Sequence, residues 1–283
     1  MTNVKTPVDH LFSSKAYHIL SDLVFQHSRI RLGPDKRALV ANRLRKRLQT
    51  LELDSYEEYC AVLQSPHGAA EVEELVDLIS TNHTRFYREP EHFTFLTRRV
   101  LPALAPELNA ARAPLRLWSA AASSGEEPYT MAIAIAECLQ AFPALKWQIF
   151  ATDISRRMLA TAAQGVYPMD AVKPVPPDLL KRYFQKGVGG RTGFCRVKPE
   201  LRQRLQFERV NLFQAHYPVP AKMHVIFCRN VMIYFDHASR AEAVSRLAHH
   251  LTPGGYLVIG HSESLMGIRH GLHPVQHGVF QKT

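Results

Sequence analysis

The sequence predicts an α/β protein in which a parallel sheet with helices on both faces follows an all-helical segment. Two observations predict this fold. From residue 115 onward, short apolar runs typical of buried strands alternate with helical patterns, as expected for a parallel sheet. Before residue 80, apolar residues recur at helical spacing. With 283 residues, the chain is long enough for more than one domain.

Residues 8 to about 78 are predicted to form a small helical bundle. A second helix is expected after Gly33-Pro34, because proline suits a first helical turn, and its apolar residues fall on one stripe. Residues 56–63 and 72–79 are expected to form two further helices. The first helix carries Leu11, Phe12, Tyr17, Ile19, Leu20, Leu23 and Val24, and the stripe of the second consists of Val40, Leu44, Leu48 and Leu51.

The second helix is strongly basic. Arg43 and Lys46 project from faces other than the apolar stripe, and Arg45 lies on a flank. A solvated helix face and a docking surface for an acidic partner both fit this pattern. In the whole chain Lys and Arg outnumber Asp and Glu, 35 to 25. The basic residues of this stretch are Arg31, Lys36, Arg37, Arg43, Arg45, Lys46 and Arg47, against Asp35 alone.

The segment from Ser80 to Phe93, STNHTRFYREPEHF, is polar and aromatic and contains Glu89-Pro90. Its composition predicts a linker that carries function. A helix with Phe93, Phe95, Leu96 and Val100 is expected to follow.

The alternating region is interrupted once. Strands are expected at residues 115–119, 147–152, 225–228 and 257–259, and helices at 129–141, 155–164 and 238–250. Between residues 167 and about 204, several prolines and the turn GVGGRTG predict a small antiparallel insertion. This turn is not a dinucleotide fingerprint, because Thr192 stands at the third glycine position and the flanks resemble hairpin strands.

Several classes of protein are excluded by composition. No apolar run approaches the roughly 20 residues that span a bilayer, and the N-terminus lacks the apolar region of a signal peptide. A soluble, cytoplasmic protein without membrane insertion is therefore expected. Neither a disulfide nor a metal site is predicted from the separated cysteines or from the histidines that lack nearby acidic clusters. These residues are Cys60, Cys138, Cys195 and Cys228, and His249, His250, His270, His273 and His277.

The stretch LRLWSAAASSGEEPY, residues 115–129, predicts a strand, a small-residue turn and a helix start. Open parallel sheets bind ligands beyond the carboxyl ends of their strands, where helix N-termini present backbone N–H groups. Small residues such as Ala121 and Gly125 permit a close approach. Glu127 can bind an amino group, although complementing the helix dipole is an alternative role. Because GxGxxG is missing, a nicotinamide dinucleotide is disfavoured.

Three further loops follow predicted strands. Asp153 ends the second strand and can accept hydrogen bonds from ribose hydroxyls or cap the next helix. Asn211, before Leu212, can read the polar edge of adenine. Arg229 and Asn230 interrupt an apolar strand end, where polar groups are costly unless they have partners. Tyr234 lies just beyond, with packing as the alternative to a role at the substrate.

Five motifs in order resemble the CheR family of bacterial chemotaxis receptor methyltransferases. They are TNHTRFYRE, SAAASSGEEPY, ATDIS, FCRNVMIYF and LTPGGYLVIGHSESL. The resemblance implies a Rossmann-like class I S-adenosylmethionine-dependent methyltransferase with an all-helical N-terminal domain and a small antiparallel β-subdomain insertion. It implies a receptor-contacting helical domain over residues 1–79, a cofactor-site linker over 80–92, and a methyltransferase domain over 93–283 with its insertion at about 167–204.

The family transfers the methyl group of S-adenosylmethionine to chemoreceptor glutamates, leaving methyl esters and S-adenosylhomocysteine. By motif, the resemblance implies that Glu127 contacts the methionine amino group and Asp153 the ribose. Spacing leaves Glu126 as the alternative for the amine. Arg88 and Tyr234 match residues near the transferred methyl. The other matched cofactor positions are Asn82, Thr84, Arg88, Asn211, Leu212, Arg229 and Asn230, and Ala121 and Gly125 belong to the same loop.

The resemblance also implies partners. The basic second helix, with Arg43, Arg45 and Lys46, matches the family's contact with the helical cytoplasmic domain of the receptor. The β-subdomain can pair with a receptor C-terminal tail. A monomer without metal is expected. A nucleic-acid methyltransferase would need aromatic platforms among its basic residues, and residues 31–47 contain none. A sensor that binds the cofactor without methyl transfer is the other alternative.

Overall fold

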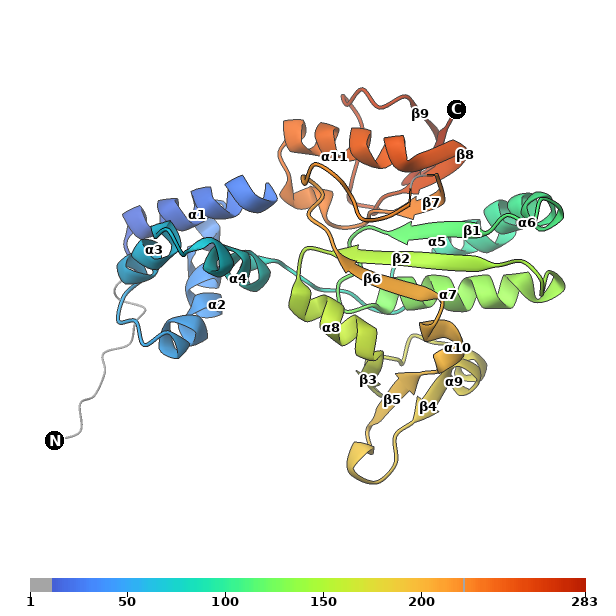
Figure 1. Cartoon of the computed structure of the whole chain (residues 1–283), viewed down its shortest axis with the longest axis horizontal. Helices are drawn as coiled ribbons and strands as arrows, with labels where there is room; N and C mark the ends of the chain where they lie inside the picture. The colour runs from blue at the N-terminus through green and yellow to red at the C-terminus, as the bar shows by residue number, and fades with distance from the viewer. Residues whose placement is uncertain (1–11, 221) are drawn as a thin grey trace. The chain divides into compact units, whose positions relative to one another are not determined.

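The computed structural model describes residues 12–220 and 222–283, which form two compact units (Figure 1). The first unit extends to Thr81 and includes Tyr234–Asp236, and the second comprises Asn82–Ile233 and His237–Thr283. Leu11, predicted to belong to the first helix, lies outside the described residues.

The first unit is a helical bundle of α1 (Ser14–Ser28), the 3₁₀ turn η2 (Pro34–Lys36), α2 (Arg37–Thr50), α3 (Tyr56–Gln64) and α4 (Ala69–Ile79). Side-chain caps start two of the helices: Ser13 accepts from the Ala16 N–H and Ser55 from the Glu58 N–H. The predicted stripe of α2 is confirmed for Val40, Leu44 and Leu48, which are fully buried. The fourth helix begins three residues before its predicted start.

The second unit contains a seven-stranded sheet in the order β6-β2-β1-β7-β8-β10-β9 (Figure 1). Strands β6 (Leu205–Arg209), β2 (Trp147–Asp153), β1 (Leu115–Ser119), β7 (Met223–Phe227) and β8 (Leu251–Val258) pair in parallel. β9 (Leu272–Gln276) and β10 (Val279–Lys282) are antiparallel additions that the prediction lacked. β8 also begins six residues earlier than expected, because Leu251 pairs with Met223 of β7 ahead of the apolar run.

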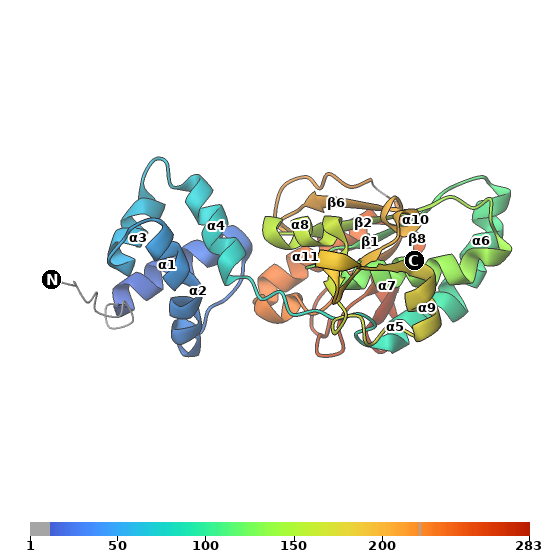
Figure 2. The ribbon, with the colours of Figure 1, turned by 90° about the horizontal axis from the view of Figure 1, so that it is seen from below.

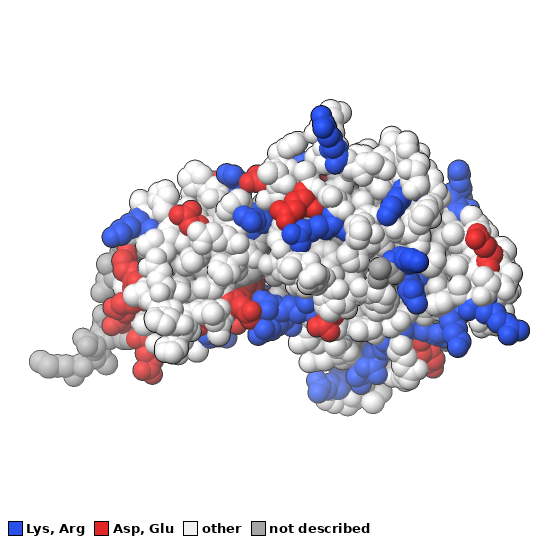
Figure 3. Space-filling model, turned by 45° about the horizontal axis from the view of Figure 1, so that its top comes forward, with Lys and Arg blue, Asp and Glu red and all other residues white. Residues whose placement is uncertain are grey.

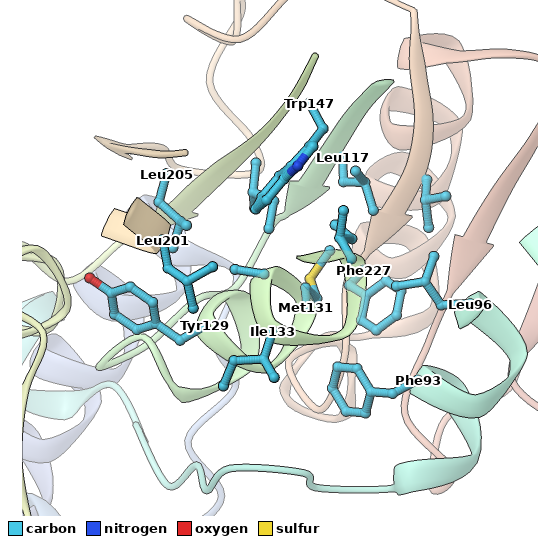
Figure 4. Close-up of a cluster of buried hydrophobic side chains, with 14 of the residues drawn as sticks. Phe93, Leu96, Leu117, Tyr129, Met131, Ile133, Trp147, Leu201, Leu205 and Phe227 are labelled. Carbon is cyan, nitrogen blue, oxygen red and sulfur yellow. The ribbon is translucent and has the colours of Figure 1, made fainter. Parts of the chain in front are cut away.

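The main core lies between the sheet and α7 (Glu126–Cys138), whose start directly after Gly125 confirms the helix start predicted within residues 115–129. Tyr129, Met131 and Ile133 of this helix lie in one cluster with Leu117 and Phe227 of the sheet (Figure 4). The other helices and turns of this unit are α5 (Pro90–Phe95), the π-helical turn η3 (Leu96–Val100), α6 (Leu101–Ala110), η4 (Leu139–Ala141), α8 (Arg156–Gln164), α9 (Pro177–Tyr183), α10 (Pro199–Arg202), η6 (Met232–Tyr234) and α11 (His237–His250).

The predicted antiparallel insertion is a three-stranded sheet of order β3-β5-β4, made of β3 (Val166–Pro168), β5 (Phe194–Val197) and β4 (Phe184–Lys186). Its glycine-rich turn contains the short 3₁₀ turn η5 (Gly189–Arg191). The Tyr167 hydroxyl donates to the Ser124 carbonyl at 2.7 Å, so this sheet is fixed to the loop after β1. No helix of the described residues is long and apolar enough to cross a membrane.

Candidate cofactor and methyl-transfer site

The loop after β1 is held against the end of β2. The Ser123 N–H donates to Asp153 Oδ2 at 2.8 Å, and the Ser155 N–H donates to Asp153 Oδ1 at 2.9 Å. Ser155, whose hydroxyl accepts from the Met158 N–H, is the N-cap of α8. Asp153 is therefore not the cap that the sequence offered as its alternative role. A carboxylate oxygen has two lone pairs and can accept more than one hydrogen bond.

The linker between α4 and α5 contains neither helix nor strand (Figure 2). The Ser123 hydroxyl donates to the Asn82 carbonyl at 2.9 Å, which places the start of the linker beside the loop after β1. Phe86 is fully buried and contacts Tyr167 and Phe184 edge to face, at centroid distances of 5.0 and 5.7 Å. Phe86 therefore anchors the linker, while Thr84, two residues earlier, stays partly exposed.

Position 125 requires a glycine for two reasons, its backbone conformation and the atoms that lie beside it. Its φ is +99°, and a Cβ atom there would lie 2.7 Å from the Tyr167 hydroxyl and 2.9 Å from the Ala162 Cβ. α7 begins directly after it, with no side-chain cap. Ala121, in the same turn, is partly exposed.

A buried ion network joins the linker to β1 and β7. Arg229 Nη1 donates to Glu127 Oε2 at 2.9 Å, and Arg229 Nη2 donates to Glu89 Oε2 at 3.0 Å. Nη2 also donates to the Arg88 carbonyl at 2.5 Å. Glu127 Oε1 accepts from the Ser119 hydroxyl at 2.7 Å. One cation thus lies between two carboxylates, and the arrangement fixes the backbone of Arg88.

The acidic groups of this region differ in their electrostatics. Burial raises the pKa of Glu127, although Arg229 and Ser119 oppose the shift. Burial also raises the pKa of Glu126, whose Oε2 accepts from the Ser124 hydroxyl at 2.7 Å. For Glu89 burial acts in the same direction, but Arg229 and Asn230 outweigh it and hold the pKa below its ordinary value. Glu89 is therefore the firmest anionic partner of Arg229.

The loop after β6 continues the same edge of the sheet. The Val210 N–H donates to the Asp153 carbonyl at 3.0 Å, so Asn211 follows directly on a contact with the end of β2. Asn211 Oδ1 accepts from the Phe213 N–H at 3.0 Å, which orients its side chain, and Leu212 is buried.

The two residues predicted near the transferred methyl lie in different surroundings. Arg88 Nη1 donates to the His83 carbonyl at 2.9 Å, and its side chain is 29% exposed. Tyr234 ends η6, partly exposed, in the three-residue segment that groups with the helical unit.

The predicted receptor-contacting residues also differ among themselves. The Arg43 guanidinium donates to the carbonyls of Ile79 and Ser80 at the end of α4, and to the Thr81 hydroxyl at 3.3 Å. This arginine therefore caps a helix. Arg45 and Lys46 are exposed, and Arg45 Nη2 donates to Asn42 at 3.2 Å.

Glu89, His92 and Glu263 were missed by sequence reasoning. Glu89 has φ +54° and Glu263 lies in the GHSES motif, but only the fold shows what their carboxylates contact. Glu89, His92 and His261 offer ligand atoms within 4.8 Å of one another. We assign no ion there, because Arg229 lies 3.0 Å from Glu89 and Glu89 Oε1 accepts from Asn230 Nδ2 at 3.1 Å.

Comparisons with known proteins cover both units. Residues 82–279 match the family described as CheR methyltransferase, SAM binding domain, and residues 15–80 match CheR methyltransferase, all-alpha domain. The chain is 38% identical over 256 residues to a chemotaxis protein methyltransferase of Salmonella typhimurium, covering 90% of this chain and 86% of that protein. It is 37% identical over 287 residues to chemotaxis protein methyltransferase 2 of Pseudomonas aeruginosa, covering 99% and 98%.

Among solved structures, the N-methyltransferase NodS of Bradyrhizobium japonicum aligns with 67% of this chain and 70% of its own, at 15% identity and a TM-score of 0.33. This likeness is too slight to carry an argument.

Proposed function

Since the chain belongs to the CheR methyltransferase family, we propose that it methylates glutamate side chains of membrane-bound chemoreceptors with S-adenosylmethionine. The products are γ-glutamyl methyl esters and S-adenosylhomocysteine, and the enzyme acts as a cytoplasmic monomer. The observation that carries the proposal is the contact of Ser123 with both Asn82 and Asp153, because it gathers the linker and two strand ends at one place.

The side chains at this place fit S-adenosylmethionine. Asp153 has acceptor capacity for the ribose hydroxyls, and Glu127 or Glu126 for the methionine ammonium group. Asn211 and Leu212 suit the edge and face of adenine, and the small Ala121 leaves room in the turn that Gly125 shapes by its backbone conformation. When bound, S-adenosylmethionine supplies a methyl group on a positively charged sulfur.

The residues of the chain have little proton chemistry to perform. A glutamate carboxylate with a reference pKa of about 4.3 is ionised at neutral pH and needs no base. The protein must align the carboxylate oxygen with the methyl carbon and exclude water. Arg229 is neutralised by Glu127 and Glu89, whereas the Arg88 side chain is 29% exposed and its Nε lies 4.0 Å from Glu89 Oε1, which supports Arg88 as the guanidinium that receives a carboxylate from receptor or cofactor. We assign Tyr234 to orienting the nucleophile by a hydrogen bond.

Receptor recognition is proposed for α2. The exposed Arg45 and Lys46 present positive charge to the acidic receptor helices, and Arg43 shapes this surface by capping α4. The edge strands β3 and β4 of the small sheet are candidates for pairing with an extended receptor tail.

One experiment tests this function. The protein is incubated with methyl-labelled S-adenosylmethionine and membranes from cells with and without chemoreceptors. We expect base-labile label in proteins of receptor size only in the first membranes, because esters hydrolyse in base and N-methyl groups do not. Base-stable label, or equal label in both membranes, would contradict the proposal. Label in added nucleic acid would favour the alternative class of substrate.

A further inference from the structure

Glu263 is a buried acid with no cationic partner among the described residues. It is 8% exposed, and burial raises the pKa of its carboxyl group. Backbone N–H groups oppose that shift: those of Asn230, Gly260, Met232 and Ile233. A buried carboxylate that is stabilised by backbone N–H groups requires those groups to be held in fixed positions.

Its hydrogen bonds join two loops. Glu263 Oε2 accepts from the Asn230 N–H at 2.9 Å and from the Gly260 N–H at 2.6 Å. Glu263 Oε1 accepts from the Met232 N–H at 2.7 Å. Glu263, in the loop after β8, thereby binds the backbone of residues 228–233, the loop after β7. These contacts do not depend on the side chains of residues 228–233.

The loop of residues 228–233 is strained and closely packed. Asn230 has φ +58°, a conformation that asparagine tolerates but that still needs support. A Cβ atom at Gly260 would lie 2.5 Å from Asn230 Nδ2 and 3.0 Å from the Asn230 backbone nitrogen. From the other side, Glu89 Oε1 accepts from Asn230 Nδ2 at 3.1 Å. Two carboxylates therefore hold Asn230, one through its backbone and one through its side chain.

We propose that Glu263 is a positioning residue for methyl transfer, because its carboxylate fixes the loop that carries Arg229 and Asn230 and leads into Tyr234. This inference rests on the proposed function. Glu263 contacts the backbone N–H groups of Asn230 and Met232 and acts through the backbone of the loop.

The test is Glu263→Gln in the full chain, with the exposed Glu107→Gln as the matched control. The amide would present an N–H group to a backbone N–H group, so the loop should loosen. We expect kcat to fall at least tenfold at saturating S-adenosylmethionine while the receptor KM stays within twofold. Hydrogen exchange of the peptide 228–234 should become at least tenfold faster, with α2 unchanged. The control should match the wild type in all three measurements.

A kcat within twofold of the wild type would overturn the inference, as would a reduced kcat with unchanged exchange of that peptide. If Glu263→Gln does not fold, Glu263→Asp, which shortens the reach by one methylene, is judged by the same criteria. Failure of the wild type to methylate receptors would overturn the proposed function instead. The affinity for S-adenosylhomocysteine and the exchange of peptide 228–234 would then still decide the role of Glu263.

Discussion

Arg229 is predicted to contact the cofactor, although its guanidinium is occupied by two carboxylates of the protein. Its guanidinium is buried between Glu127 and Glu89 and lies within cation–π distance of Phe93 and Phe227, 5.5 and 5.7 Å from the ring centroids. Removing one partner of a buried ion pair typically costs about 3–5 kcal/mol, because the remaining charge is left uncompensated. Here the second carboxylate limits that cost, so substitutions at Glu127 can be studied in a folded protein.

Glu127→Gln should weaken binding of S-adenosylhomocysteine about tenfold, equivalent to about 1.4 kcal/mol, because the ammonium group loses its anionic partner. Isothermal titration calorimetry measures this directly. Glu126→Gln is the matched control, since it changes the adjacent buried acid. If the control weakens binding more than Glu127→Gln does, the amine contact belongs to Glu126.

Tyr234→Phe should lower kcat for receptor methylation by about 10²-fold while leaving the affinity for S-adenosylhomocysteine within about twofold, because the lost hydroxyl orients the nucleophile only. Steady-state kinetics together with calorimetry separates the two quantities. Equal losses in both would make Tyr234 a binding residue. Tyr183→Phe, at a partly exposed tyrosine of the second unit whose hydroxyl donates to Glu137, controls for loss of a hydroxyl.

His92 should make the second unit sensitive to acid. Burial and the nearby Arg229 lower its pKa to about 3. Since an unfolded histidine has a pKa of about 6.5, its contribution to stability is complete above that value and is lost as the pH falls toward 3. Between pH 7.5 and 5.0 this histidine alone should remove about 2 kcal/mol from the free energy of unfolding.

His92→Leu should abolish this part of the pH dependence, whereas the exposed His67→Gln should not. Urea unfolding can be followed by tryptophan fluorescence, because Trp118 and Trp147 both lie in the second unit. If the free energy of unfolding of His92→Leu depends on pH as that of the wild type does, protonation of His92 does not destabilise the folded protein and the prediction is wrong.

Helix α2 contains basic residues with two different tasks. Reversing Arg45 and Lys46 together to Glu should raise the receptor KM about tenfold without altering thermal stability, since both side chains are exposed. Arg43→Lys keeps the charge but loses the forked hydrogen bonds to Ile79 and Ser80, so it should cost about 1 kcal/mol of stability in the first unit. Circular dichroism and receptor methylation kinetics together test this division. An unchanged KM for the double reversal would remove α2 from the receptor contact.

Individual elements differ in how far the sequence predicts them. Val40, Leu44 and Leu48 specify one face of α2, because a helix repeats over several turns. β9 and β10 are short and joined by His277-Gly278, so few residues carry their pattern. β8 begins before its apolar run at residues 257–259, because Leu251 already pairs with Met223 of β7, a contact that the local pattern does not record.

The net charge of +10 has a consequence for the entire protein. Lys and Arg side chains are more frequent than Asp and Glu on the face of the second unit seen in Figure 3. Long-range attraction to acidic receptors weakens with salt, because the Debye length falls from about 10 Å at 0.1 M to about 3 Å at 1 M. The receptor KM should therefore rise severalfold between 50 and 300 mM NaCl, whereas the KM for S-adenosylmethionine should change less than about twofold. A parallel rise of both values would point to a general effect of salt on the fold.

The sequence by itself determined the fold class, because hydrophobic periodicity and turn residues are local properties, and its five motifs indicated the family and its cofactor. It also singled out Asp153, Glu127 and Arg229 by their places after strands. Only the tertiary structure decided which groups these side chains contact. Ser155 rather than Asp153 caps α8, Arg229 pairs with Glu89 from a distant segment, and Glu263 holds the loop of Asn230. Such contacts join residues far apart in the chain, and no local pattern records them.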